Sequence, residues 1–252
     1  MQMLRWVINR NIAMSKALDR WLWPSMAIDG NRTFVGMVRG AIGTDLVVAE
    51  VGGGKSPLFS VQEVGDKRLV VIGIDIDSSE LAAAPAGAYA QTICADISRF
   101  IGQSSADAVI VQSLLEHVSD NASGMRGIAS LCKPGGRVYT FCPNRRAWFA
   151  MINRLLPESV KRKILFAIYP HTRDNQGFPA YYDRCTPREM SASMAAAGLE
   201  VHRIEPFFIS SYFMFCFPLF VFWRIVTLPL MRLWPMTFCE TFIIEAAKPQ
   251  SP

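Results

Sequence analysis

The stretch EVGGGK at residues 50–55 directly follows the apolar run LVVA at residues 46–49, and it precedes Ser56 and Pro57. This order predicts a strand, a glycine loop and the start of a helix, with Ser56 as the N-cap and Pro57 at the first helical position. Glycines allow positive φ angles and a close approach of the backbone to a ligand, and exposed amides at a helix start favour negative groups. The stretch therefore predicts a binding site for a small charged cofactor.

The spacing of the glycines separates the cofactors that could use this loop. A phosphate-binding P-loop needs a glycine five residues before the triplet GKS at 54–56, and Ala49 occupies that position. A dinucleotide fingerprint starting at Gly52 needs its third glycine where Pro57 stands, which weakens that pattern and leaves it open. The pattern that remains is an acid followed by x-G-x-G, with Glu50 as the acid.

This pattern resembles the loop of class I S-adenosylmethionine (SAM) dependent methyltransferases, and four further segments resemble that family in the expected order. They are VVIGID at 70–75, TICADI at 92–97, ADAVIVQSLLEHV at 106–118 and LCKPGGR at 131–137. The resemblance covers roughly residues 45–143 and is closest in kind to type 11 and quinone-pathway methyltransferases. Because the segments are ordered, together they weigh more than any one motif.

The resemblance implies a SAM site built from two further acids. In the family, the acid that ends the second strand binds both ribose hydroxyls, and Asp75 holds that position here. The acid after the third strand faces the adenine amino group, and Asp96 holds that position. Taken singly, each acid could equally be a turn-forming residue or a helix cap. The implied cofactor-binding residues are Glu50, Gly52, Gly53, Gly54, Asp75, Ile76, Asp96, Ile97 and Gln112.

Alternating strands and helices predict an α/β fold with a parallel, right-handed sheet. The family has a Rossmann-like sheet of seven strands, whose last two strands, here about 199–206 and 237–246, pair antiparallel. We expect one methyltransferase domain over 1–252, with a helix beginning after Thr186 and ending near Gly198. Its parts are basic amphipathic helices at 1–43, the SAM-binding core at 44–143, a helical substrate-cap insertion at 144–185 and a hydrophobic insertion at 207–235.

The net charge of +5 is distributed unevenly along the chain. Residues 1–24, 145–173 and 206–236 carry +3, +6 and +2, so the remainder is acidic at −6. These basic segments are also rich in large apolar residues, which favours an anionic membrane surface as partner; ordinary solvated helix faces are the alternative. No nucleic-acid-binding module is recognisable, so no nucleic-acid partner is expected. The six cysteines show no C-x-x-C pair, which fits a reducing cytoplasmic compartment.

The hydrophobic insertion contains seventeen uncharged residues, 207–223, at the lower limit for a membrane-spanning helix. Antiparallel flanking strands would return both of its ends to the same side, and Pro218, Arg224 and Pro229 are expected to divide it into short pieces. We therefore expect a monotopic hairpin or an interfacial pair of helices at the inner face of the membrane. A hydrophobic lid over the substrate pocket remains an alternative.

Methyl transfer from a sulfonium is an in-line displacement, so positioning supplies much of the catalysis, and a base is needed only where the acceptor loses a proton. His117 and His171 are the candidate bases, with Tyr181, Tyr182 and Asp183 as possible orienting groups. In the quinone-pathway O-methyltransferases that this stretch resembles, a glutamate three residues before the Glu-His pair can join a metal site. This chain has Ser113 there, so no metal is expected.

The sequence thus predicts a SAM-dependent methyltransferase that acts on a lipid-linked or hydrophobic acceptor at the membrane, with oxygen as the favoured atom. Two alternatives stay open. One is a soluble small-molecule or glycan methyltransferase with a hydrophobic lid, and the other is a membrane-attached, non-catalytic scaffold. A scaffold would be expected to lose its cofactor-binding acids, whereas Glu50, Asp75 and Asp96 are all present. The acceptor and the oligomeric state are not predicted.

Overall fold

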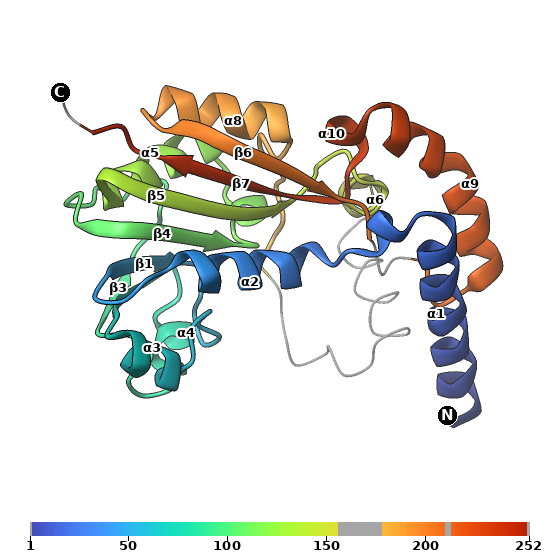
Figure 1. The fold of residues 1–252 in the computed structure, drawn as a ribbon, viewed down its shortest axis with the longest axis horizontal. Helices are drawn as coiled ribbons and strands as arrows, with labels where there is room; N and C mark the ends of the chain where they lie inside the picture. The colour runs from blue at the N-terminus through green and yellow to red at the C-terminus, as the bar shows by residue number, and fades with distance from the viewer. Residues whose placement is uncertain (1, 156–177, 210–212, 251–252) are drawn as a thin grey trace.

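A seven-stranded sheet of order β3-β2-β1-β4-β5-β7-β6 forms the centre of the computed structural model, which describes residues 2–155, 178–209 and 213–250 (Figure 1). The strands are β1 (Val47–Val51), β2 (Val70–Asp75), β3 (Gln91–Cys94), β4 (Ala106–Gln112), β5 (Cys132–Pro143), β6 (Glu200–Phe207) and β7 (Thr241–Ala247). β1 to β5 pair in parallel, and β7 pairs antiparallel with both β5 and β6. The predicted fold class is confirmed.

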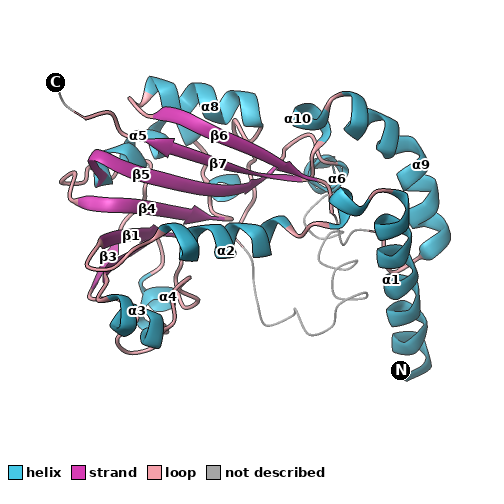
Figure 2. Ribbon diagram, viewed as in Figure 1, coloured by secondary structure: helices cyan, strands magenta, loops and turns pink. Residues whose placement is uncertain are grey.

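Helices flank the sheet on both faces and continue beyond one end of it (Figure 2). They are α1 (Gln2–Leu22), η1 (Pro24–Ala27), α2 (Gly30–Ala41), α3 (Val61–Lys67), α4 (Ser78–Ala82), η2 (Leu115–His117), α5 (Asn121–Leu131), α6 (Trp148–Leu155), α8 (Pro187–Ala196), α9 (Phe217–Leu233) and α10 (Pro235–Phe238). As predicted, two helices occupy most of residues 1–43, and Thr186 caps α8 by accepting a hydrogen bond from Glu189 N. Residues 95–105 contain a turn and no helix.

Alternate residues of the central strands enter two different cores. In β4, Val109 and Val111 pack on the face covered by α5 and α8, while Ile110 packs with Phe34 and Val38 of α2 on the other face. Successive side chains of a strand point to opposite faces, so a sheet covered on both sides needs almost continuous apolar strands. The sequence of β4 meets this requirement. Because the helices cover the two faces, the carboxyl ends of the strands of the sheet remain free for a site.

The helix after the glycine loop begins at Val61, so the predicted start at Ser56 and Pro57 is wrong. Ser60 is the N-cap, and its side chain forms a capping box with Glu63. Between the loop and this cap, Leu58 and Phe59 are buried in the core. The chain therefore passes through a turn and bends that place two residues in the core before the helix starts.

Within the hydrophobic insertion, residues Phe217–Leu233 form one continuous helix, α9, so the predicted division at Pro218, Arg224 and Pro229 is wrong. Pro218 lies in the first turn, where its missing N–H costs nothing, and Pro229 is accommodated inside the helix. Arg224 does not interrupt α9 because its charge is paired with Asp19 in the interior. The antiparallel return is confirmed, since Phe207 lies opposite Thr241. Among the described residues, no helix is both long and apolar enough to cross a membrane.

Candidate active site

The glycine loop leaves the carboxyl end of β1 and is held against β2. Gly52 has a φ of 79° and donates from its N–H to Ile74 O at 2.8 Å. A Cβ atom on Gly53 would lie 2.6 Å from both Glu50 Oε1 and Tyr89 Oη, so only glycine fits. Tyr89, which no sequence pattern singles out, also donates from its hydroxyl to Gly54 O at 3.2 Å. The loop is thus packed tightly against β2, Glu50 and Tyr89, which precedes β3.

Glu50 is a buried acid at the start of this loop. Its Oε1 accepts a hydrogen bond from Leu58 N at 2.8 Å, while its Oε2 has no hydrogen-bond partner among the described residues. Burial raises the pKa of this carboxyl to about 7, and the bond from Leu58 offsets part of the effect. A buried polar atom left unpaired costs free energy. The site therefore offers an unused acceptor to a ligand that brings a donor or a positive charge.

Asp75 ends β2 and faces the same loop. Its Oδ1 accepts from Asp77 N at 3.0 Å, and its Oδ2 would lie 3.3 Å from a Cβ atom on Gly54. Partial burial raises the pKa of Asp75, and the charges of Glu80 and Asp77 act in the same direction. The next residue, Ile76, is 59% exposed although it is apolar. An acceptor group and an exposed apolar side chain therefore stand together at this edge, as a nucleoside would require.

Asp96 and Ile97 follow β3 at the same edge of the sheet, since Cys94 pairs with Asp75. Oδ1 of Asp96 accepts from the backbone N–H and the hydroxyl of Ser98 at 2.9 and 2.7 Å. These are the hydrogen bonds of a turn-forming aspartate, and Oδ2 stays 4.0 Å from Arg99 Nε. Ile97 is buried in the core. The two positions adjoin the predicted site, with Asp96 serving the local turn.

A cavity of about 430 Å³ brings several of the predicted residues together. Glu50, Gly52, Gly53 and Gln112 all line it, with Gln112 placed at the carboxyl end of β4. The remaining lining residues are Asn31, Val51, Ser56, Ser113 and Phe141. Gln112 Nε2 donates to Asn31 Oδ1 at 2.6 Å, which links β4 to the first turn of α2. No signal in the sequence connects Asn31 with the glycine loop. Asn31 lies 19 residues before Glu50, and only the fold brings α2 to the cavity.

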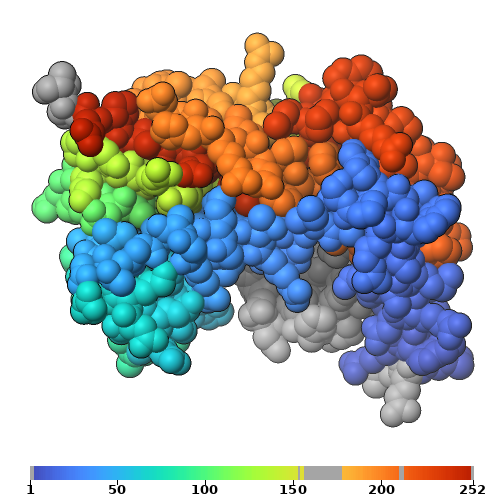
Figure 3. All heavy atoms as spheres, in the orientation of Figure 1, coloured from blue at the N-terminus to red at the C-terminus, as the bar shows by residue number. Residues whose placement is uncertain are grey.

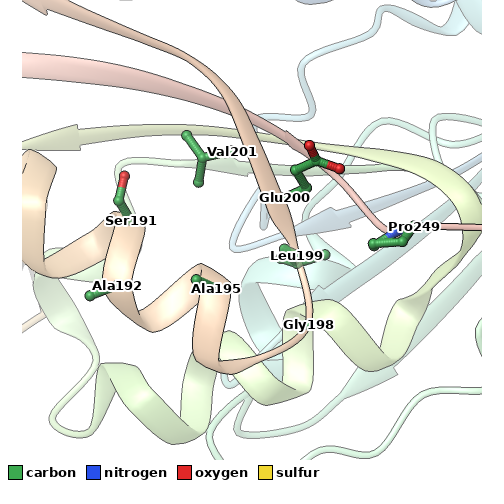
Figure 4. A pocket seen from close by; sticks show the side chains of 8 residues that line it. All are labelled: Ser191, Ala192, Ala195, Gly198, Leu199, Glu200, Val201 and Pro249. Carbon is green, nitrogen blue, oxygen red and sulfur yellow. The ribbon is translucent and has the colours of Figure 1, made fainter.

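A second hollow, of about 600 Å³, lies between α8 and the start of β6 (Figure 4). Its polar side chains include Ser191 and Glu200, and none of the predicted site residues line it. β6 runs parallel to β5, so its first residues lie at the amino edge of the sheet, opposite the glycine loop. Ligands of open α/β sheets bind at the carboxyl edge, so the smaller cavity beside Glu50 is the candidate cofactor site despite its size.

His117 lies in η2, after the carboxyl end of β4. Its Nδ1 is 2.9 Å from Pro179 O, and a carbonyl can only accept, so Nδ1 carries the proton of this hydrogen bond. Nε2 is then the unprotonated nitrogen of the neutral ring. Glu116 Oε1 lies 3.9 Å from Nε2, and burial raises the pKa of the Glu116 carboxyl to about 7. The pair places a proton acceptor next to a buried carboxyl.

The segment 178–185 is docked on η2 and α5 through its backbone. Tyr181 N and Tyr182 N both donate to Glu116 O, at 2.8 and 3.0 Å, and Asp183 Oδ2 accepts from Asn121 N at 2.9 Å. The group that orients the His117 ring is the Pro179 carbonyl, which the sequence analysis did not predict. Asp183 serves to hold the segment in place. His171, the other candidate base, and residues 156–177 of the predicted substrate-cap insertion lie outside the described residues.

These residues fit the cofactor that the sequence implies. The unpaired Oε2 of Glu50 suits a cationic group, the Asp75 carboxylate suits a diol, and Gly53 lies too close to Glu50 and Tyr89 to carry a side chain. Within the described parts of the chain, no group of three or more His, Cys, Asp or Glu side chains could hold a metal ion. The six cysteines are free thiols.

The family described as "Methyltransferase domain" matches residues 49–140, the stretch that contains the loop and the cavity. Ubiquinone biosynthesis O-methyltransferase of Aeromonas salmonicida is 32% identical over 141 residues, which are 52% of this chain and 54% of that protein. The chain thus spans about half the length of the curated relatives that it matches.

Solved structures share the fold at low sequence identity. A SAM-dependent methyltransferase from Methanosarcina mazei matches with a TM-score of 0.51 and 17% identity, covering 85% of this chain and 98% of that one. Phosphoethanolamine N-methyltransferase 2 of Haemonchus contortus, solved in complex with SAM, matches with a TM-score of 0.53 and 16% identity, covering 87% of this chain and 53% of that one. Residues 49–140 thus match a methyltransferase domain, and the chain shares its fold with these SAM-dependent methyltransferases.

Proposed function

We propose that this protein transfers a methyl group from SAM to an oxygen atom of a hydrophobic or lipid-linked acceptor at the inner face of the membrane. The observation that carries the proposal is that Glu50 and Gly53 line one cavity while Asp75 faces the same glycine loop, within the segment that matches the methyltransferase family. When bound, SAM supplies an electrophilic methyl group on a sulfonium. The protein must bind this cofactor, orient the acceptor and remove a proton.

Binding falls to the carboxyl edge of β1, β2 and β4. Glu50 offers its unpaired oxygen to a cation, Asp75 accepts hydrogen bonds from hydroxyls, and Gln112 lines the same cavity as Glu50. Charge-assisted hydrogen bonds are about twice as strong as neutral ones, so the two acids contribute most of the specificity. Ile76 adds an exposed apolar surface for a planar base.

Proton removal is assigned to His117. Its Nδ1–H is held by Pro179 O, which fixes the ring and leaves Nε2 free to accept the proton of an acceptor hydroxyl. Glu116, when ionised, would stabilise the imidazolium that forms, since its Oε1 is 3.9 Å from Nε2. The need for such a base favours oxygen as the methylated atom. The matched relative from Aeromonas salmonicida is named as an O-methyltransferase, in agreement with this assignment.

The surroundings of His117 favour an apolar acceptor. Phe178 lies edge-on to the imidazole with a centroid distance of 6.4 Å, and both Phe178 and Tyr181 are exposed. Exposed aromatic rings beside a base form a surface on which a hydrophobic substrate can be positioned. We therefore expect the acceptor to partition into lipid.

The test is transfer of label from methyl-labelled SAM into a cell extract that has been separated into lipid and aqueous fractions. We expect label in the lipid fraction and a loss of about 10²–10⁴ in rate for His117→Asn. Asparagine keeps a donor near the Nδ1 position for Pro179 O but has no basic nitrogen, so the local structure is preserved. Label confined to the aqueous fraction would instead support a soluble acceptor, and full activity of H117N would remove His117 from the mechanism.

A further inference from the structure

The outward face of α9 is apolar along the whole helix. Phe222 and Ile225 are 66% and 68% exposed, and further exposed apolar residues of this helix are Leu219, Val226 and Leu233. Intervals of three, four and seven residues separate Leu219, Phe222, Val226 and Leu233, which places them on one side. The opposite side is buried, with Phe220, Trp223, Arg224, Thr227 and Met231 turned toward the protein. A surface helix ordinarily exposes polar residues, so this face of α9 lacks a partner within the described chain.

α1 exposes a second apolar stripe. Met3, Val7, Met14 and Trp21 are exposed and recur at intervals of four and seven residues, which places them on one side of the helix. Trp21 alone is 78% exposed. Ser15 and Asp19 are buried on another side. α1 therefore has a buried stripe that packs on the protein and an exposed apolar stripe that does not.

The two helices form one unit at the end of the molecule away from β1–β3 (Figures 1 and 3). Arg224 Nε and Nη2 donate to the two oxygens of Asp19 at 2.7 and 2.6 Å, and both side chains are buried. Phe217 N also donates to Asn11 Oδ1 at 3.1 Å, which connects the start of α9 with the middle of α1. The apolar faces of α1 and α9 are therefore held in a fixed relation.

The charge that remains exposed on this unit is entirely positive. Asp19 is the only acid in the sequence of either helix, and Arg224 neutralises it in the interior. The exposed charged residues of the pair are Arg5, Arg10, Lys16, Arg20 and Arg232. Two of these lie over indole rings, Arg10 over Trp6 and Arg232 over Trp23. Cations beside tryptophan on an apolar helix face are typical of elements that lie in the headgroup region of a bilayer.

We propose that the paired helices α1 and α9 are a membrane-docking surface that binds peripherally to bilayers containing anionic lipids. Apolar side chains such as Phe222 and Ile225 would enter the headgroup region, and the exposed arginines and lysine would contact lipid phosphates. This docking surface rests on the proposed function only for its purpose, which is to bring the cofactor site to an acceptor in the lipid phase. β6 and β7 hold both ends of the insertion at the carboxyl edge of the sheet, where the cofactor site lies.

A second copy of the chain suits this surface less well than a lipid bilayer does. Pairing two such faces would oppose several positive charges with no exposed acid between them, and like charges in close contact disfavour association. Anionic lipid headgroups supply the missing negative charge. The surface therefore favours phospholipid over self-association.

The test is co-sedimentation of the full chain with vesicles of phosphatidylcholine, alone or mixed in equal parts with phosphatidylglycerol. We expect binding to the mixed vesicles, at least tenfold weaker binding to phosphatidylcholine alone, and weakening of the interaction by salt. The variant Phe222→Ser/Ile225→Ser should lose at least tenfold in affinity. Each of Arg5→Gln, Lys16→Gln and Arg20→Gln should cost about fivefold on mixed vesicles and little on phosphatidylcholine. Ile101→Ser is the matched control, since Ile101 is an exposed apolar residue that follows β3.

Binding of S-adenosylhomocysteine, measured on the same preparations, separates this proposal from the proposed function. Variants that lose vesicle binding but keep nucleoside binding are folded, and they support the docking surface. Equal binding of the wild-type protein and the F222S/I225S variant to mixed vesicles would overturn it, as would absence of binding by folded wild-type protein. Light scattering without vesicles tests whether a second copy of the chain binds this face. A wild-type dimer that F222S/I225S converts to a monomer would show that it does.

Discussion

Glu50 has two properties that do not favour stability of the free protein. It is buried with one oxygen unpaired, and burial raises its pKa to about 7. Near neutral pH the carboxyl is therefore only partly ionised in the free protein. A cationic group bound beside it stabilises the ionised form, so ligand binding and proton release are linked at this residue.

We predict that the affinity for S-adenosylhomocysteine rises as the pH increases from about 5.5 to 7 and then levels off. Below its pKa, Glu50 must lose a proton before it can pair with the ligand ammonium, so affinity should change by up to about tenfold per pH unit. Calorimetry in two buffers of different ionisation enthalpy would detect the released proton. A Glu50→Gln variant should bind more weakly and lose this dependence, and an unchanged pH profile in E50Q would contradict the role given to Glu50.

Elements whose signals are local could be predicted from the sequence. The strands β2 and β4, the capped helix α8 and the glycine loop each show their pattern within a few residues. The signal for the start of α3 is also local, but the prediction placed this start at Ser56 and Pro57. Ser60 with Glu63 forms the stronger cap and begins the helix.

Other features depend on partners far away in the chain. Arg224 was expected to interrupt the hydrophobic insertion, yet Asp19, 205 residues earlier, pairs with it and allows a continuous α9. The ring of His117 is oriented by Pro179, 62 residues later, and the cavity wall includes Asn31, 81 residues before Gln112. No pattern within a short window carries this information, because the fold alone brings these residues together.

The pairing of α1 with α9 predicts a non-additive response to substitution. Arg224→Met leaves the Asp19 carboxylate buried without its partner, and loss of one member of a buried pair costs about 3–5 kcal/mol of unfolding free energy. Replacing both members, as in Asp19→Leu/Arg224→Met, removes both charges and should cost markedly less than R224M alone. Urea unfolding of the three proteins measures the difference. Equal destabilisation in the single and double variants would show that the ion pair does not hold the two helices together.

At the scale of the whole molecule, buried carboxyls should make the unliganded protein less stable at alkaline pH. Burial raises the pKa of Glu50 and Glu116 to about 7 and that of Glu240 to about 8, from an ordinary value of 4.5. Between those values the folded state binds more protons than the unfolded state, so stability is greatest below about pH 4.5 for these groups and is lost as the pH rises to about 8.

We therefore predict a lower Tm at pH 8.5 than at pH 5.5 for the unliganded protein. Each carboxyl contributes up to about 1.4 kcal/mol per pH unit within its window. Neither oxygen of Glu240 has a hydrogen-bond partner among the described residues, so Glu240→Gln should flatten the pH dependence with little loss of packing. Thermal unfolding followed by circular dichroism at several pH values would check this. A Tm that rises over the same range would contradict the expected contribution of these groups.

The most direct measurement is calorimetric titration of the purified full chain with S-adenosylhomocysteine, alongside Asp75→Ala and the control Asp66→Ala. Asp66 is an exposed acid on α3, on the amino side of β2, whereas Asp75 faces the glycine loop. Hydrogen bonds to a charged group contribute about 1.5–3 kcal/mol, so Asp75→Ala should weaken binding at least about tenfold. We expect saturable binding by the wild-type protein and by Asp66→Ala. Folded wild-type protein that does not bind, or Asp75→Ala that binds as tightly as wild type, would contradict it.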